Sequence, residues 1–502
     1  DGAALLVGPG WAEEPATKIL SGGSTSSAQA VDREKLKSTA RPVSSIAVLP
    51  FIHLSSDPED EYFCDGLAEE LLNALAKVEG LNVASRTSAF SFKGKNVTMG
   101  EIAEALGVSS VLEGSVRRSG NRLRIGIQLI NASDDRRVWT ERFDREMKDI
   151  FDIQDEIALC VVDALKVKLL GDERAAVLKR YTNNPHAYEL FLKGRSHWYK
   201  HTPEAVQKSA AYFKQAIEID PDYAPGHAGL AEFYGLSAAL GMMDPDVGWR
   251  LAEATMTRAR ELDDSIPEIH NGLAAIRGMY YRDFPGAELE LQRAMRLNAK
   301  FVEVHSLRSV LLTAEGRFDE AITDARKAVE MEPLSITYRR YLGWWFHYAR
   351  RFDEAVAKYT EVLGMDSYFV PVYQDLSDTY FCKGDIENAV RSWRKLVGIT
   401  GDEEISNAID TAESPARAMA AASNISLDRL NRRLAAGDWV APAEIARCYV
   451  RLGDSDNAFS WLEKASKGRD FFSLFLSVDP FYDPLRSDPR FDEMLQKQRS
   501  MS

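Results

Sequence analysis

The strongest constraint on this sequence is a period of 34 residues in its second half. Three-residue motifs recur with this step at Arg282–Phe284, Gly316–Phe318, Arg350–Phe352 and Gly384–Ile386. Alanines keep the same step at Ala287, Ala321, Ala355 and Ala389. So do the pairs Asn298-Ala299, Glu332-Pro333 and Asp366-Ser367. Such a chain folds as a solenoid, because each repeated unit buries its apolar face only against its neighbours.

The residue types at the repeated positions indicate two antiparallel helices in each unit. Small side chains let such helices cross closely, which accounts for the alanines at the start of each second helix and for those near its end, at Ala216, Ala259, Ala294, Ala328 and Ala465. Pro221 and Pro333 follow second helices and end them. A helix–turn–helix unit of 34 residues is typical of tetratricopeptide repeats, which this half of the chain resembles. We expect repeats over 181–400, a degenerate helical repeat over 401–438, and a last repeat with a C-terminal cap over 439–502.

The preceding part of the chain changes character twice. Residues 1–43 are rich in glycine, serine, alanine and proline, which predicts a disordered linker. Residues 44–170 alternate short apolar runs with helical patterns, roughly in the order β-α-β-α-β-β-β-α. The strand at Ile46–Phe51, the helix at Glu61–Val78 and the hairpin turn at Ser119-Gly120-Asn121 are clear examples. The predicted fold is a small mixed α/β domain followed by an all-α tetratricopeptide solenoid.

Residues 44–170 resemble the TolB-like, or FlgO-like, amino-terminal domain. The resemblance rests on motifs at Ile46–Phe51, Glu61–Leu71, Ser85–Ser88, Leu106–Val108, Leu112–Arg117, Gln128–Ile130, Val138–Arg145 and Phe151–Ile157. Proteins similar to this one often join that domain to tetratricopeptide repeats, downstream of a class III nucleotide cyclase domain or a winged-helix DNA-binding domain. The segment Asp479–Phe491 also looks like the end of such chains.

The resemblance implies a non-catalytic sensor or regulatory module of a bacterial signalling protein. The favoured expectation is the regulatory part of a membrane-bound adenylate or guanylate cyclase, tethered to the membrane upstream of Asp1 and lying in the periplasm. A stand-alone envelope scaffold and the regulatory end of a winged-helix transcription factor are the alternatives, and a cytoplasmic location is the alternative placement. The expected partner is a protein or peptide held by the concave face of the repeats.

Composition and motif content restrict the function classes. The formal net charge of −14 argues against broad nucleic-acid binding, because an acidic surface repels phosphate. The four cysteines are far apart, so no cysteine zinc site is expected. The sequence contains no nucleophile elbow, Walker loop, HExxH or dinucleotide fingerprint, so we expect neither an enzyme nor a cofactor in this chain. His197 and His201 are interpreted as a surface pair, and Asp57–Glu61 as a solvated turn rather than a calcium loop.

In tetratricopeptide repeats, the first helix of each unit lines the concave face, and its inward positions recur in a fixed register. That register nominates a protein-binding groove of Ile276, Met279, Tyr280, Arg340, Trp344, His347, Tyr348, Gln374, Asp378 and Phe381. Tryptophan, tyrosine and arginine are frequent interface anchors, and the alternative is that several of these side chains pack the next helix pair. A carboxylate clamp is not expected, because Trp344 stands where such a clamp needs asparagine.

A second candidate contact lies in the α/β domain. Arg86, Thr87 and Ser88 follow a predicted strand end, where ligands often bind in α/β folds, and Phe90 and Phe92 lie beside them. A small molecule or a peptide is the ligand class expected there. Self-association through the solenoid ends or the sheet edge stays open as a route to a homodimer.

Overall fold

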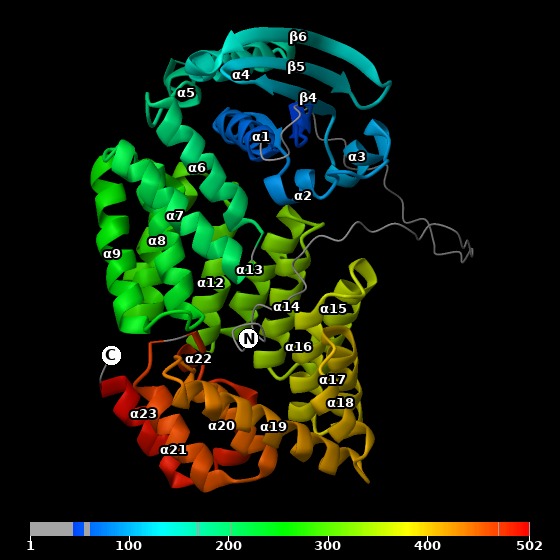
Figure 1. Ribbon diagram of the computed structural model, residues 1–502, viewed down its shortest axis with the longest axis vertical. Helices are drawn as coiled ribbons and strands as arrows, with labels where there is room; N and C mark the ends of the chain where they lie inside the picture. Colours follow the sequence, from blue (N-terminus) through cyan, green and yellow to red (C-terminus); the bar gives the residue numbers. More distant parts are fainter. Residues whose placement is uncertain are drawn as a thin grey trace, which may run out of the picture.

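The computed structural model describes residues 44–54, 61–167, 169, 171–200, 202–469 and 471–500. The predicted linker at 1–43 lies outside the described residues. An α/β domain sits at one end of a long helical solenoid, and the C-terminal helices return to lie beneath the middle repeats (Figure 1). The predicted fold class, a small mixed sheet with helices followed by helical repeats, is confirmed.

A six-stranded sheet forms the centre of the α/β domain. Its strands are β1 (Ser44–Val48), β2 (Ile52–His53), β3 (Leu81–Val83), β4 (Ser110–Ser119), β5 (Arg122–Asn131) and β6 (Arg136–Glu146). The order is β3-β1-β4-β5-β6, and β2 pairs with β4 beyond the end of β1. β1 is parallel to β3 and β4, whereas β4, β5 and β6 form an antiparallel meander. The predicted hairpin turn is present, with Gly120 at a φ of 56° between β4 and β5.

Helices cover both faces of this sheet. They are α1 (Glu61–Ala76), α2 (Arg86–Phe90), α3 (Met99–Leu106), the short 3-10 helix η3 (Met147–Asp149) and α4 (Ile150–Ala164). α1 and α4 share a core with Ile46 and Val48 of β1, whereas α3 packs against Leu49 and Val111 on the other face. The alternation of side chains along each strand separates these two cores.

From α5 (Gly171–Val177) onward, every described element is helical. The hairpin pairs are α6 (Pro185–Trp198) with α7 (Pro203–Ile219), α8 (Ala224–Ala239) with α9 (Pro245–Leu262), α10 (Pro267–Ala275) and its π-helical end η4 (Ile276–Tyr280) with α11 (Phe284–Leu297), α12 (Val302–Ala314) with α13 (Phe318–Met331), α14 (Ile336–Tyr348) with α15 (Phe352–Met365), α16 (Val370–Lys383) with α17 (Ile386–Thr400), and α20 (Pro442–Leu452) with α21 (Ser455–Ser466). Where the sequence predicts a degenerate repeat, α18 (Glu403–Asp410) and α19 (Pro415–Ala435) form an unequal pair. The chain then continues through α22 (Phe471–Leu474), the 3-10 helix η5 (Pro480–Leu485) and α23 (Pro489–Ser500).

The 34-residue period is visible in the backbone of the turns. Arg282, Gly316, Arg350 and Gly384 begin the four repeated motifs, and their φ values are 58°, 78°, 60° and 84°. A left-handed residue ends the first helix of a pair and lets the chain turn into the second. Glycine adopts this conformation freely, whereas an arginine there costs roughly 1–2 kcal/mol.

Small residues are enclosed at the helix crossings, as predicted. Ala287, Ala321, Ala355 and Ala389 have 0% exposed surface. In the pair α14–α15, a Cβ on Gly343 would lie 2.4 Å from a ring carbon of Tyr359. The tyrosine of the second helix therefore fills the space above the glycine of the first.

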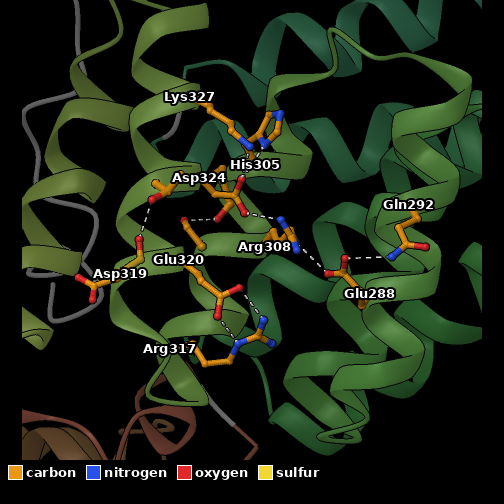
Figure 2. A network of polar contacts seen from close by, with 12 residues as sticks. Glu288, Gln292, His305, Arg308, Arg317, Asp319, Glu320, Asp324 and Lys327 are labelled. Carbon is orange, nitrogen blue, oxygen red and sulfur yellow. Dashed lines mark hydrogen bonds and ion pairs between the residues drawn. The ribbon is translucent and has the colours of Figure 1, made fainter.

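Buried ion pairs join neighbouring units, and Figure 2 shows the network around Asp324. One of its carboxylate oxygens lies 3.2 Å from His305 Nδ1, and the other accepts a hydrogen bond from Arg308 Nη1 at 2.8 Å. Arg308 Nε also donates to Glu288 of α11 at 2.9 Å, so α11, α12 and α13 are tied together. Burial raises the pKa of Asp324, but these contacts and Lys327 outweigh it and hold the pKa below its ordinary value.

The α/β domain and the first helix pair share one hydrophobic core. Buried residues of α1, such as Leu67, belong to the same cluster as Leu192 of α6 and Phe213 of α7. A Cβ on Gly66 would lie 2.7 Å from a methyl carbon of Leu192, which shows how closely α1 and α6 approach. The predicted boundary between 170 and 181 thus separates two topologies but not two packing units. Among the described helices, none is both long and apolar enough to cross a membrane.

Candidate functional site

A chamber of about 1360 Å³ lies along the concave side of the solenoid. One end is walled by α1 and by residues 82–87 of the α/β domain. The first helices of successive pairs, from α6 to α16, line its side, and Arg447, Phe471 and Phe472 line the other end. Small-molecule sites usually measure about 300–1,000 Å³, so this chamber has room for more than a compact ligand.

Eight of the ten residues of the predicted groove line this chamber, namely Ile276, Met279, Arg340, Trp344, His347, Tyr348, Gln374 and Asp378. The other two pack elsewhere: Tyr280 stacks on Trp249, and Phe381 stacks on Phe481 with ring centroids 5.0 Å apart. The repeat register therefore leads to the inner side of the solenoid, and the role of these residues in binding stays a prediction.

Two of the groove residues are committed to the next helix pair. The buried guanidinium of Arg340 donates two hydrogen bonds to Asp375 of α16, at 2.5 and 3.1 Å. His347 Nδ1 lies 2.9 Å from the hydroxyl of Thr379, also on α16, and burial lowers the pKa of this histidine. Arg340 and His347 therefore pack against the next helix pair, which is the alternative that the sequence left open for these positions.

The chain's own C-terminal segment, residues 471–485, covers the aromatic end of the chamber. Phe475 is fully buried, and its ring centroid lies 4.8 Å from that of Tyr348. The ring of Phe471 lies 6.1 Å from that of Trp344. The C-terminal residues pack on the last repeat, since Phe481, Leu485 and Phe491 share a core with α20 and α21. Residues 471–478 of the same segment also reach back over the middle repeats. The C-terminal segment therefore covers one end of the predicted groove, next to Trp344 and Tyr348.

Two repeat-turn arginines anchor this segment. Arg350 holds Asp483 with two hydrogen bonds, at 2.8 and 2.5 Å. Arg282 Nη2 donates to Ser473 Oγ at 2.9 Å. These are the arginines that occupy left-handed positions suited to glycine, so their contacts with the segment offset the local strain.

The last repeat closes the solenoid on itself. Arg447 of α20 contacts Asp378 of α16 at 3.2 Å and Asp479 of the C-terminal segment at 2.6 Å. Trp249 of α9 donates a hydrogen bond from Nε1 to the carbonyl oxygen of Arg469 at 2.9 Å, across 220 positions of sequence. Repeats that are far apart along the chain thus line the same chamber.

At the other end, Glu69 joins the α/β domain to the first repeat. Its buried carboxylate accepts hydrogen bonds from Arg86 Nε at 2.9 Å, Arg195 Nη2 at 2.8 Å and Tyr199 Oη at 2.8 Å. Burial alone would raise the pKa of Glu69, but the two arginines and the tyrosine hold it at about 2. Arg86 also lies over the ring of Tyr199, 3.4 Å from its centroid.

The remaining predicted sites are placed as follows. Of the second candidate contact, Arg86, Thr87 and Phe90 line the chamber, whereas Ser88 and Phe92 do not. His197 stacks on Tyr212, but His201 and residues 57–60 lie outside the described residues. Within the described part of the chain, no group of three or more potential ligands could hold a metal ion.

Four carboxylates that sequence reasoning missed also line the chamber, and we call them the acidic ring: Glu232, Glu268, Glu303 and Glu332. Burial raises the pKa of Glu232 and Glu332 to about 7 and that of Glu303 to about 8, and it also raises that of Glu268. Mutual repulsion adds to the shift, since Glu268 and Glu332 both raise the pKa of Glu303. Glu303 is exposed and lines the chamber.

A sequence signal for part of the acidic ring exists. Glu268 and Glu303 occupy the first turns of α10 and α12, in corresponding places of successive units. An acidic residue in the first turn of a helix also interacts favourably with the helix dipole. Because this arrangement is common, the sequence does not indicate that Glu268 and Glu303 both line the chamber.

Comparisons with known proteins match two segments of the chain to regulatory domains. Residues 42–159 match the model of the HilA/YgeH-like transcriptional regulator, second domain, and residues 250–367 match that of the bacterial transcriptional activator domain. A protein named putative adenylate cyclase 3, from Rhizobium meliloti (strain 1021), is 41% identical over 187 residues, which are 37% of this chain and 32% of that protein. The chain spans about a third of the length of that relative.

Several solved structures are similar in architecture. A TPR protein of Thermus thermophilus is 16% identical and covers 39% of this chain and 99% of its own, with a TM-score of 0.34. YrrB, described as a TPR protein with an unusual peptide-binding site, is 19% identical and covers 40% of this chain and 100% of its own, with a TM-score of 0.27. Yeast Tom70 is 14% identical, covers 70% of this chain and 82% of its own, and has a TM-score of 0.38. The TolB-like resemblance of 44–170 stays a prediction, since the model that matches this segment describes the HilA/YgeH-like domain.

Proposed function

We propose that this chain is a regulatory protein-interaction module of a bacterial signalling protein, and that its concave face exchanges its own C-terminal segment for a segment of a partner protein. The observation that carries the proposal is the seating of residues 471–478 of this segment against the aromatic end of the chamber. This segment lies where the repeat register predicts a peptide ligand. Its contacts indicate the chemistry of the partner, which offers aromatic side chains to Trp344 and Tyr348 and a carboxylate to Arg350.

The energetics of the segment allow exchange. The Arg350–Asp483 pair leaves 37% and 36% of its two side chains exposed, and such a pair contributes at most about 1 kcal/mol. Apolar contacts centred on Phe475 hold the segment on the middle repeats, whereas Phe481, Tyr482 and the buried Arg447–Asp479 pair hold it on the last repeat. A segment tethered to its own groove competes at an effective concentration of roughly millimolar, so a partner has to exceed that before it binds. Exchange of this kind makes binding conditional, as a regulatory module requires.

The chamber also gives a route from the groove to the α/β domain. The C-terminal segment walls one end and the α/β domain walls the other. At the second end, Glu69 of α1 is held by Arg195 and Tyr199 of α6, so a shift of the first repeat moves the carboxylate that also binds Arg86. The coupling that we propose runs from the groove through the first repeat to Glu69.

Two output domains are candidates. The relative that is named as an adenylate cyclase supports a nucleotide cyclase. The two matched family models, both from transcriptional regulators, support a transcription factor as the second candidate. A membrane tether and a periplasmic location belong to the cyclase version, whereas the transcription-factor version places the chain in the cytoplasm. In both versions this chain regulates the reaction or the DNA contact and does not itself catalyse.

A peptide exchange experiment tests the groove. A fluorescent peptide with the sequence of residues 471–488 is titrated into the wild-type chain and into a Phe475→Ala variant, with a scrambled peptide as the control. Since the variant weakens the competing segment, we expect it to bind the peptide at least about tenfold more tightly than the wild type. Equal binding by both chains, or binding by neither while circular dichroism shows the variant folded, refutes exchange at this groove.

The output is tested on the full-length protein. Cyclic nucleotide formation and binding to promoter DNA are measured for the wild type, for Tyr199→Phe, and for Tyr368→Phe, whose side chain is 72% exposed. We expect Tyr199→Phe to change one of the two outputs and Tyr368→Phe to change neither, because Tyr199 donates a hydrogen bond to Glu69 and Tyr368 is exposed. If Tyr199→Phe leaves both outputs at wild-type levels, the proposed coupling is wrong.

A further inference from the structure

When its carboxylates are ionised, the acidic ring carries negative charge that the chain does not neutralise. Three other carboxylates of the chamber are paired: Glu69 with Arg195, Asp375 with Arg340 and Asp378 with Arg447. Of the ring, Glu232 has one distant contact with Arg195, at 3.8 Å. Glu268, Glu303 and Glu332 form no ion pair with any residue that the structure describes. A chamber wall with unpaired carboxylates attracts cations.

Glu332 shows most directly that a donor is missing. Its side chain is 3% exposed, and its Oε2 is buried without a hydrogen-bond partner among the described residues. The hydroxyls of Ser85 and Thr87 lower the pKa of Glu332 without compensating for burial. A buried carboxylate oxygen without a donor costs several kcal/mol when it is ionised, so native structures nearly always satisfy it. Asn271 adds a second buried oxygen without a partner to the chamber wall, on its Oδ1.

Aromatic rings lie beside these carboxylates. Tyr338 lines the chamber in the first turn of α14, and Glu303 and Glu332 both raise its pKa, so the three groups share one neighbourhood. Tyr341 packs edge-on against Tyr338, with ring centroids 6.5 Å apart. Carboxylates together with tyrosine faces are the surroundings that an organic ammonium group prefers, because the ring quadrupole and the anions attract the same charge.

The arrangement favours a particular kind of cation. Since the described residues offer no cluster of three ligands, a single metal ion would leave most of the ring unpaired. A cation with several charges along a chain could instead reach carboxylates on α8, α10, α12 and the α13–α14 turn. A long polypeptide is less suitable, because the α/β domain and residues 471–472 wall the two ends of the chamber.

We propose that the chamber binds a small aliphatic polyamine. Its ammonium groups pair with Glu303, Glu332 and Glu268, and its methylene chain lies against Tyr338. The site is separate from the aromatic groove that the C-terminal segment covers, so the proposal does not depend on peptide exchange. The polyamine also joins the α/β domain to the repeats, because Ser85 and Thr87 adjoin Glu332.

Calorimetric titration with spermidine tests this site. The titration is run at about pH 8.5, above the pKa values of the ring carboxylates, on the wild type and on Glu303→Gln and Glu332→Gln. We expect each substitution to weaken spermidine binding at least about tenfold, which corresponds to the loss of one charge-assisted contact. The matched control is Glu218→Gln, an exposed glutamate of α7 that changes the net charge equally and should leave the affinity within about twofold.

Other cations separate the proposal from its competitors. Magnesium chloride of equal ionic strength and a tetralysine peptide are titrated in parallel. Spermidine binding that exceeds both and that depends on Glu303 and Glu332 supports the proposal. Binding of spermidine no tighter than that of magnesium, equal binding by all three glutamine variants, or tighter binding of tetralysine than of spermidine overturns it. The glutamine variants remove repulsion, so their melting temperatures should be no lower than that of the wild type, which keeps a negative result interpretable.

Discussion

Substitution of Phe475 by alanine tests how firmly the C-terminal segment is held. The side chain is fully buried among the rings of Tyr348, Phe471 and Trp345, whose centroids lie 4.8, 5.0 and 6.1 Å away. A Phe→Ala substitution at such a site removes the transfer free energy of the ring and leaves a cavity, which together cost about 3–5 kcal/mol. The full loss appears only if the segment stays in place. If the free energy of docking the segment is smaller than this cost, the segment detaches. The measured loss of stability then equals the free energy of docking.

Urea unfolding followed by tryptophan fluorescence and far-ultraviolet circular dichroism distinguishes these outcomes. A helical-repeat chain of this size need not unfold in two states, so the first transition is the one to compare. We expect that transition to be destabilised by about 3–5 kcal/mol, or by less with a red-shifted emission in the native baseline as Trp344 and Trp345 gain solvent. Tyr368→Ala, at a side chain that is 72% exposed, should change stability by less than about 0.5 kcal/mol. An unchanged transition with an unchanged emission spectrum for Phe475→Ala would refute the packing described for the segment.

Three further predictions concern the solenoid and its chamber. Gly343→Ala should lower the free energy of unfolding by about 1–3 kcal/mol, because the new Cβ would lie 2.4 Å from the ring of Tyr359. Gly364→Ala should not destabilise the protein, since no atom lies within 4 Å of its Cβ. Equal urea midpoints for the two variants would contradict the crossing geometry. Asp324→Asn should cost about 1–3 kcal/mol in the same assay, because its side chain is 3% exposed and loses charge-assisted contacts with Arg308 and Lys327, and an unchanged urea midpoint would show that the network is dispensable. Ionisation of Glu332 is less favourable in the folded state, where its pKa is about 7 against an ordinary 4.5. The free energy of unfolding should therefore fall as the pH rises from 4.5 through 7, and Glu332→Gln should reduce that fall. Parallel pH profiles for both chains would count against the buried carboxylate.

The repeat architecture could be predicted because its determinants are local. Arg282 and Arg350 stand in register with Gly316 and Gly384, and all four adopt the same left-handed φ, so the period alone located the turns. The enclosed alanines follow for the same reason, since two helices of a pair are close in sequence as well as in space. In the α/β domain, the strand β2 and the helices α2 and η3 were not predicted, because two to five residues are too few to show a period.

The candidate site was less predictable because it depends on the curvature of the whole solenoid. The register correctly led to the chamber wall for residues such as Trp344, but periodicity carries no information about contacts across 220 positions, such as that between Trp249 and Arg469. The sequence therefore indicated the contact of the C-terminal residues with the last repeat but not the contact of residues 471–478 with the middle repeats. Glu303 illustrates the same limit, since an acid in the first turn of a helix is ordinary until the superhelix turns it toward other acids.

The C-terminal segment covers part of the concave face of its own chain. Hydroxyl-radical footprinting of the intact protein measures this most directly, by comparing the oxidation rates of Tyr348 and Phe475 with that of exposed Tyr368. If the C-terminal segment lies on the middle repeats, Tyr348 and Phe475 should be oxidised far more slowly than Tyr368, and both should react faster after Phe471→Ala. Oxidation of Tyr348 and Phe475 at the rate of Tyr368 in the wild type would contradict the account, because the concave face would then be open and the segment free.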